Sequence, residues 1–220
     1  GYDQLGVALE LRGLIGEETK IAYNKAIQLD QDFALAYAHL GRLQRRNGLV
    51  SESNASYRKA KQLSTDVPTM ILVADVLQSQ QRYIDSEELL RIALRSDPKN
   101  PTALYLLGRA LIVRRSFDEA ESVLRKSVEV SPNSFVSYTL LGSVYYTSGK
   151  LEQAENTLNQ ALKVISENEK KRLAQEFEEV GDRYVKVNKN AEAVRVYTRA
   201  KELDKTKESI TLKLTQAQNK

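Results

Sequence analysis

A Leu-Gly dipeptide recurs along this chain at nearly constant spacing. Its copies are Leu5-Gly6, Leu40-Gly41, Leu107-Gly108, Leu141-Gly142 and the variant Val180-Gly181. With Ala74 counted as a degenerate copy, successive small residues are 35, 33, 34, 34 and 39 residues apart. A period of about 34 residues is typical of proteins built from stacked two-helix units. The sequence therefore predicts a repeat array rather than a globule.

Apolar residues recur in register with the glycine. In the clearest unit, Leu104, Leu107 and Leu111 are spaced i, i+3 and i+7, which places them on one face of a helix around Gly108. A second helix would carry Leu124 with small residues on the same face, so we expect Gly108 to cross against Ala120 and Ser127. Neither helix can bury its apolar face alone, and stacking of units is the expected solution.

This pattern resembles the tetratricopeptide repeat, whose consensus is W-x2-L-G-x2-Y, A-x3-F, P. The next unit matches it through Tyr138, Leu141-Gly142, Tyr145 and Ala154. The resemblance covers almost the whole chain and implies an all-α fold, a right-handed α-α superhelical solenoid forming a single domain over residues 1–220. The six expected repeats are approximately residues 1–33, 34–66, 67–100, 101–134, 135–168 and 169–205, followed by a capping helix at about 206–219.

Helix-boundary residues agree with this division. Asn100-Pro101 and Asn133-Ser134 are typical helix starts, and Asp97-Pro98 and Ser131-Pro132 would end the preceding helices. Two glycines, Gly48 and Gly149, are expected in the turn between the helices of a unit.

The sixth unit departs from the period. Its extra residues fall in 166–175, a stretch with high helix propensity, so a lengthened first helix is expected. Beyond Asp204, Ile210, Leu214 and Ala217 have helical spacing and predict the capping helix. Residues 210–214 also alternate with period two, which would equally fit a strand.

Charge and composition exclude some classes of protein and leave others open. The net charge is +4, from 33 basic and 29 acidic residues that are interspersed, as in an ordinary solvated surface. Related pentatricopeptide repeats read RNA, but the basic clusters Arg45-Arg46, Arg114-Arg115 and Lys170-Lys171-Arg172 occupy different places in their units. The absence of cysteine excludes disulfides and cysteine-metal sites.

Enzymatic chemistry finds little support in the sequence. The single histidine, His39, adjoins the Leu40-Gly41 core pair, and there is no cysteine nucleophile. Neither a glycine-rich phosphate loop nor a metal-ligand spacing occurs. We therefore predict a protein that is not an enzyme and has no cofactor and no metal.

The resemblance implies that a partner binds in a concave groove lined by the first helices. Chaperone-binding members hold a peptide carboxylate with Lys and Asn residues, and this set is missing, so binding of chaperone C-termini is not predicted. The stripe opposite the crossing glycine gives the groove candidates Arg42, Arg45, Asp75, Tyr105, Arg109, Ile112, Thr139, Ser143, Tyr146, Glu178 and Asp182.

Two features of this stripe go further. Residues 102–113 are apolar almost all round, so Tyr105 and Ile112 beside Arg109 would form a docking site for a peptide or helix, or would simply pack on neighbouring first helices. Arginines dominate the first half of the stripe, whereas Glu178 and Asp182 lie at its end. This polarity would orient a ligand, or is accidental.

The sequence thus predicts a non-enzymatic scaffold for protein-protein interaction that binds a peptide or helix. A nucleic-acid-binding repeat protein and a structural spacer or self-associating array are the alternatives. No apolar run approaches the ~20 residues of a membrane span, so a soluble chain is expected, with the cytoplasm slightly favoured. Because it lacks an initiator Met and opens inside a helix, we expect a piece of a longer protein.

Overall fold

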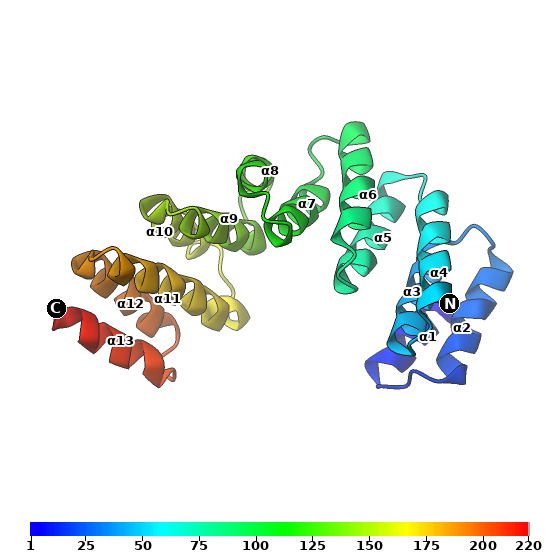
Figure 1. Cartoon of the computed structure of the whole chain (residues 1–220), viewed down its shortest axis with the longest axis horizontal. Helices are drawn as coiled ribbons and strands as arrows, with labels where there is room; N and C mark the ends of the chain where they lie inside the picture. Colours follow the sequence, from blue (N-terminus) through cyan, green and yellow to red (C-terminus); the bar gives the residue numbers. More distant parts are fainter. Residues whose placement is uncertain (220) are drawn as a thin grey trace. The chain divides into compact units, whose positions relative to one another are not determined.

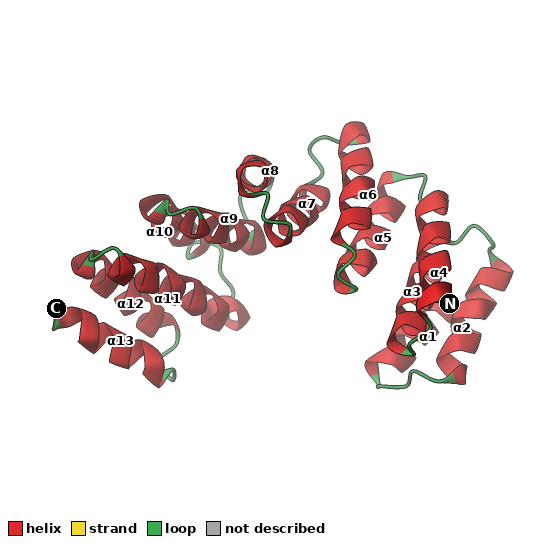
Figure 2. Cartoon of the chain, in the orientation of Figure 1, coloured by secondary structure: helices red, strands yellow, loops and turns green. Residues whose placement is uncertain are grey.

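The computed structural model describes residues 1–219, and this part of the chain contains helices and no strand (Figures 1 and 2). The all-helical prediction is confirmed. The helices are α1 (Tyr2–Leu11), α2 (Glu17–Leu29), α3 (Ala34–Arg46), α4 (Val50–Leu63), α5 (Val67–Ser79), α6 (Tyr83–Ser96), α7 (Pro101–Val113), α8 (Phe117–Val130), α9 (Phe135–Thr147), α10 (Leu151–Ala161), the 3-10 helix η1 (Glu167–Glu169), α11 (Lys170–Lys186), α12 (Asn190–Leu203) and α13 (Glu208–Gln218).

Consecutive helices pack as hairpins within two compact units. Residues 1–110 form the first unit, where α1 packs on α2, α3 on α4 and α5 on α6. The second unit begins at Leu111, and in it α9 packs on α10 and α11 on α12. Neighbouring first helices also contact one another, α3 with α5 and α9 with α11. The single domain over residues 1–220 stays a prediction.

The crossing glycine accommodates a large side chain of the second helix. A Cβ atom on Gly41 would lie 2.9 Å from Cδ1 of Tyr57, and one on Gly181 would lie 2.5 Å from Cε1 of Tyr197. Gly6 meets Tyr23 and Gly142 meets Leu158 in the same way. These four second-helix side chains are fully or almost fully buried. The glycine is therefore required because the ring or the leucine occupies the space where a side chain would be.

The expected crossing of Gly108 against Ala120 and Ser127 stays a prediction, and Gly41 shows the surroundings of an equivalent glycine. At Gly41 the small residue Ser53 is indeed close, since its hydroxyl donates to the Gly41 carbonyl over 2.8 Å. The side of Gly41 that lacks a Cβ instead faces the ring of Tyr57. The sequence pattern identified the glycine but not the residue that makes it necessary.

Each first helix is followed by a residue with a left-handed backbone conformation (positive φ). This residue lies seven positions after the small residue at the crossing. These residues are Gly13, Gly48, Gln81, Arg115, Gly149 and Asn188, with φ between 58° and 80°. Their spacing repeats the 35, 33, 34, 34 and 39 residues of the crossing positions. The turns at Gly48 and Gly149 were predicted, whereas those at Gln81, Arg115 and Asn188 were missed because none of these residues is glycine.

Side-chain caps lie at several predicted helix starts. Asn100 accepts a hydrogen bond from the Ala103 amide over 3.0 Å, and Pro101 is the first residue of α7. Ser134 caps α9 by accepting from the Ser137 amide at 3.3 Å. An unpredicted capping box between Ser166 and Glu169 starts η1 and leads directly into α11.

The C-terminal part confirms two predictions. The first helix of the sixth repeat, α11, has 17 residues against 13 in α9. Residues 208–218 form a helix rather than a strand, and α13 packs on α12 through the buried Ile210 and Ala217. It is the predicted capping helix.

The crossing geometry predicts that Gly181→Ala destabilises the second unit. Alanine normally stabilises a helix interior by about 1 kcal/mol relative to glycine. The new methyl would overlap the Tyr197 ring, which its hydroxyl holds to Asp182 over 2.6 Å. Overpacking costs about 1–3 kcal/mol, so we expect a lower urea midpoint.

The same substitution in a Tyr197→Ala background is the matched control. With the ring removed, the methyl has room, and helix propensity should raise the midpoint. A gain in both backgrounds would show that the crossing is not tightly packed.

The left-handed turns predict substitutions with opposite effects at equivalent positions. A left-handed backbone costs a non-glycine residue about 1–2 kcal/mol, part of which glycine's greater flexibility offsets. Arg115→Gly should therefore stabilise by about 0.5–1 kcal/mol, and Gly149→Ala should destabilise by about 1 kcal/mol. Urea titrations measure both, and shifts in the same direction would contradict the assigned turn.

Candidate functional site

Side chains of the first helices form polar clusters with their neighbours along the stack, and most of the predicted groove residues belong to these clusters. Between α1 and α3, the Arg42 guanidinium donates to Glu10, and the Tyr23 hydroxyl donates to the same carboxylate over 3.2 Å. Glu10 is 7% exposed and Tyr23 is fully buried. Burial, reinforced by Glu10, raises the pKa of Tyr23. Arg42 therefore joins α3 to α1 instead of projecting into solvent.

The histidine takes part in the same α1–α3 contact. His39 Nδ1 lies 2.8 Å from Oδ1 of Asp3, and both side chains are buried. The imidazole also packs at a tilt against the Tyr23 ring, with centroids 5.7 Å apart. These contacts give His39 a place in the helix packing.

A second cluster, the Tyr105 cluster, consists of Asp75, Gln78, Tyr105 and Arg109 on α5 and α7. Arg109 donates to the Tyr105 hydroxyl over 3.0 Å, to Asp75 over 2.8 Å and to the Gln78 amide oxygen. Its guanidinium carbon lies 5.5 Å from the centre of the Tyr105 ring. Tyr105 and Arg109 are half-buried and Asp75 is exposed. The structure thus brings three of the predicted residues together in one rigid group.

Hydrogen bonds of the buried Gln78 side chain fix this cluster to the helices around it. Its amide nitrogen donates to the Leu106 carbonyl over 2.8 Å and to the Ser86 hydroxyl over 3.0 Å. Gln78 is 3% exposed, so its carboxamide has one orientation that presents the oxygen to Arg109. Ile112, also predicted for the groove, is half-buried near the end of α7.

A third cluster, the Tyr146 cluster, consists of Tyr146 on α9 with Glu176 and Arg183 on α11. The Tyr146 hydroxyl donates to Glu176 over 3.2 Å, and the Arg183 guanidinium carbon lies 4.9 Å from the centre of the ring. Tyr146 is half-buried. Burial raises the pKa of both Tyr146 and Glu176. As in the Tyr105 cluster, contacts with neighbouring polar side chains, here Glu176 and Arg183, fix the position of a half-buried tyrosine ring.

Sequence reasoning missed Glu176 and Arg183. One signal was present for Glu176, which lies five residues before the crossing glycine of its repeat. The other repeats have small residues there, namely Gly1, Ala36, Thr69, Ala103 and Ser137. A large acidic residue in this column indicates a contact specific to the sixth repeat.

The two predicted hydroxyl residues of α9 bond within their own helix. Thr139 donates to the Val136 carbonyl over 3.1 Å, and Ser143 donates to the Leu140 carbonyl over 2.8 Å. Thr139 is 1% exposed, whereas Ser143 is half-buried.

The predicted acidic end of the stripe lies against the capping helix. Glu178 accepts from Lys207 over 2.6 Å and from Lys213 over 2.8 Å, and Lys213 also donates to Asp182 over 2.7 Å. Burial opposes ionisation of Glu178, yet the hydrogen bonds from the two lysines hold its pKa below the usual value. Glu178 and Asp182 therefore tie α13 to α11.

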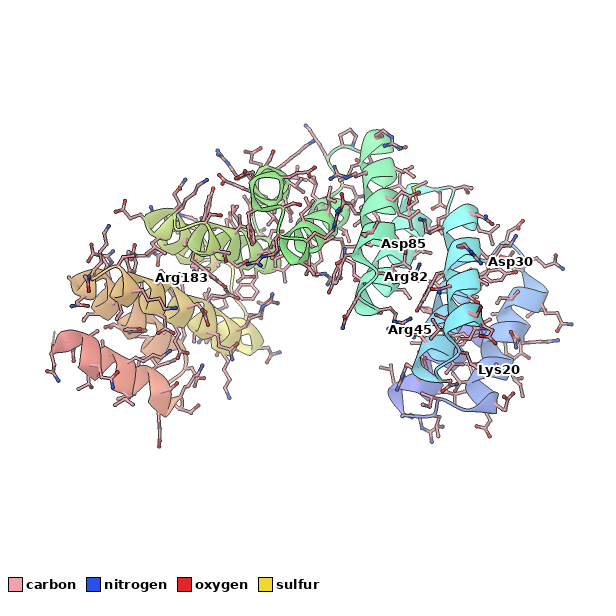
Figure 3. The ribbon with its side chains drawn as sticks, viewed as in Figure 1. Lys20, Asp30, Arg45, Arg82, Asp85 and Arg183 are labelled. Atoms are coloured by element: carbon pink, nitrogen blue, oxygen red, sulfur yellow. The ribbon has the colours of Figure 1, made fainter. Side chains whose placement is uncertain are left out.

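Arg45 differs from the other predicted residues because it is exposed and forms no ion pair within residues 1–219. It lies at the end of α3, where it lines a polar cavity with Tyr57 and Arg82. Figure 3 labels Arg45 and Arg82 in the first unit.

Within residues 1–219, no three or more His, Asp or Glu side chains are grouped so that they could hold a metal ion. Every helix in this range is too short or too polar to cross a membrane.

Comparison with known families identifies the repeats. Two family models described as tetratricopeptide repeat match the chain, one over residues 73–135 and the other over residues 136–168. A search of the curated proteins found no match.

Solved structures with the same fold cover most of the chain. The structure from a functional characterisation of Pseudomonas aeruginosa pilF aligns with a TM-score of 0.64 at 19% identity, over 99% of this chain and 95% of that one. YrrB, described as a TPR protein with an unusual peptide-binding site, aligns with 0.61 at 20% identity, over 90% and 98%. The C-terminal part of a TPR repeat-containing protein from Cytophaga hutchinsonii aligns with 0.68 at 15% identity, over 97% and 86%.

At these identities the likeness to solved structures concerns the fold. Tetratricopeptide-repeat proteins bind protein partners and are generally non-catalytic, which is consistent with an interaction scaffold. The family models, the helix hairpins and the recurring glycine crossing lead to one assignment: residues 73–168 match tetratricopeptide repeats, and the chain has the all-α solenoid fold of tetratricopeptide-repeat structures, with a C-terminal capping helix.

Proposed function

We propose that this chain is a non-enzymatic interaction scaffold that binds a peptide or helix of a partner protein on its first helices. The observation that carries the proposal is a half-exposed tyrosine fixed by an arginine in each of the two compact units. These pairs are Tyr105 with Arg109 in the first and Tyr146 with Arg183 in the second. Tyrosine and arginine are enriched among the residues that contribute most to protein interfaces.

Preorganisation supports this function. A side chain that is ordered only on binding loses conformational entropy, which weakens association. Hydrogen bonds and ring contacts already hold both tyrosines in the absence of a partner. In the Tyr105 cluster the exposed carboxylate of Asp75 adds an acceptor for a backbone amide or a basic side chain of the partner.

The remaining groove candidates have a different role in this proposal. Arg42 stabilises the stacking of neighbouring first helices, and Glu178 and Asp182 hold the capping helix α13, because their charged groups are used within the chain. Thr139 and Ser143 keep their hydroxyls within α9. Partner contact is assigned to the Tyr105 cluster, the Tyr146 cluster and their apolar neighbours, including Ile112.

Electrostatics favours a protein partner over nucleic acid. Binding to phosphates requires arginines and lysines that are available to release counterions. On the first helices Arg42 is paired with Glu10 and Arg109 with Asp75. The net positive charge of the chain therefore does not gather on this surface as a continuous basic stripe.

Tyrosine truncation tests the proposal. Peptides selected from a random display library on the intact chain should bind Tyr105→Ala or Tyr146→Ala about 30-fold more weakly, since truncating an anchor costs ~2 kcal/mol or more. Isothermal titration calorimetry measures the affinity, and circular dichroism checks the fold. Tyr83→Ala, at a half-buried tyrosine of α6, is the control and should leave affinity unchanged.

Three results would contradict this function. Peptide affinity that depends on Tyr83 but on neither Tyr105 nor Tyr146 would place the binding surface elsewhere. Micromolar RNA binding with a steep salt dependence would indicate a nucleic-acid-binding repeat protein. Failure to select any peptide, together with concentration-dependent self-association in sedimentation, would favour the structural array.

A further inference from the structure

A polar cavity that none of the Tyr105 cluster residues lines opens on the surface of the first unit. It has a volume of about 430 Å³ and lies where the end of α3 and the middle of α4 meet the turn between α5 and α6. The lining residues are Arg45, Tyr57, Ser79, Gln80, Gln81 and Arg82. This volume exceeds that of a single ion and lies within the range of about 300–1,000 Å³ that ligand pockets occupy.

The charges around the cavity leave an excess of positive charge. Arg82 donates to Asp85 over 2.8 Å, but Asp85 also binds Lys61 over 3.0 Å, and Lys61 reaches Glu88 over 2.6 Å. The carboxylates of Asp85 and Glu88 therefore neutralise the charges of Arg82 and Lys61. Arg45 adds a third cation, and it forms no ion pair within residues 1–219.

Tyr57 provides a buried donor in the same cavity. The residue is 1% exposed, and its hydroxyl oxygen is buried without a hydrogen-bond partner. Contact with Gly41 and the Arg82 guanidinium, 4.9 Å from the ring centre, fixes the ring. An unsatisfied buried hydroxyl is unfavourable, and an acceptor that enters the cavity and reaches the hydroxyl through a small shift of the wall would remove this penalty.

The geometry points to an anion pocket. We infer that Arg45, Arg82 and Tyr57 bind the oxyanion of a peptide side chain, a carboxylate or a phosphate ester. Each of the three guanidinium nitrogens of Arg82 makes one contact, two of them with Asp85 and one with Asn54. Two of its five N–H groups therefore stay available. Arg45 offers a second guanidinium, and planar guanidinium groups suit both carboxylate and phosphate.

This inference does not depend on the proposed peptide surface. Tyr105 and Tyr146 do not line the cavity, and the test uses small anions instead of a partner. A positive result here and a negative result with the display library, or the reverse, are separately interpretable.

Titration of the isotope-labelled chain with sodium phosphate, and separately with sodium acetate, tests the pocket. Backbone and arginine side-chain NMR signals of Arg45, Gln81 and Arg82 should shift and saturate at constant ionic strength. Arg45→Gln should weaken binding about tenfold and Tyr57→Phe about fivefold, since each removes one donor to the anion. Arg58→Gln, at an exposed α4 arginine outside the lining, is the matched control and should bind like the parent chain.

The two anions distinguish the sources of the oxyanion. Saturation by phosphate alone assigns a phosphate ester, and saturation by acetate assigns a carboxylate. Shifts that grow linearly with both anions, or equal losses in Arg45→Gln and Arg58→Gln, would overturn the inference. Arg45 would then only stabilise the carboxyl end of α3. Unchanged melting temperature in Arg45→Gln confirms that a loss of binding is not unfolding.

Discussion

The structure depends on the contact between a glycine of each first helix and a large side chain of the second. Two helices can approach closely only where one of them lacks a side chain, and here the space is filled from the opposite helix by Tyr23, Tyr57, Leu158 or Tyr197. These side chains are buried almost completely, so the crossing is also the centre of each hairpin's core. Seven residues later the chain turns through a left-handed residue, which sets the start of the second helix relative to the crossing.

This constraint determines which surface of the first helices can serve in recognition. The crossing occupies one face, and the contact with the next helix of the stack occupies another, where Arg42 of α3 binds Glu10 of α1 and Lys213 of the capping helix binds Asp182 of α11. Tyr105 and Tyr146 take part in other contacts of this kind: Arg109 joins Tyr105 to Asp75 of α5, and Tyr146 donates to Glu176 of α11. Both tyrosines remain half-exposed. The same hydrogen bonds that stack the helices thus hold the tyrosines in fixed positions, which links the stability of the array to the proposed binding surface.

The sequence predicted most of the fold because the crossing depends on local, repeated residues. Glycine spacing gave the helix pairs, Asn100 and Ser134 gave helix starts, and the long interval before Gly181 gave the lengthened α11. The left-handed turns at Gln81 and Arg115 could not be predicted from residue type, because the path of the chain imposes that conformation on residues that do not favour it.

The site was less predictable because its contacts join residues far apart in sequence. Position in the helix correctly grouped Tyr105 with Arg109, which are one turn apart. It could not show that Glu176 and Arg183 meet Tyr146, or that the lysines of α13 bind Glu178, because these pairs depend on how neighbouring repeats stack. The cavity at Arg45 likewise requires residues from α3, α4 and the turn after α5.

The central claim is that partners contact the first helices at Tyr105 and Tyr146, and site-specific photo-crosslinking in the organism that makes the protein measures this most directly. A benzophenone amino acid placed at position 105, 146 or 83 would be activated in cells, and the adducts identified by mass spectrometry. The account predicts that positions 105 and 146 capture a partner polypeptide and that position 83 does not. Capture at position 83 alone, or at none of the three positions, would contradict it.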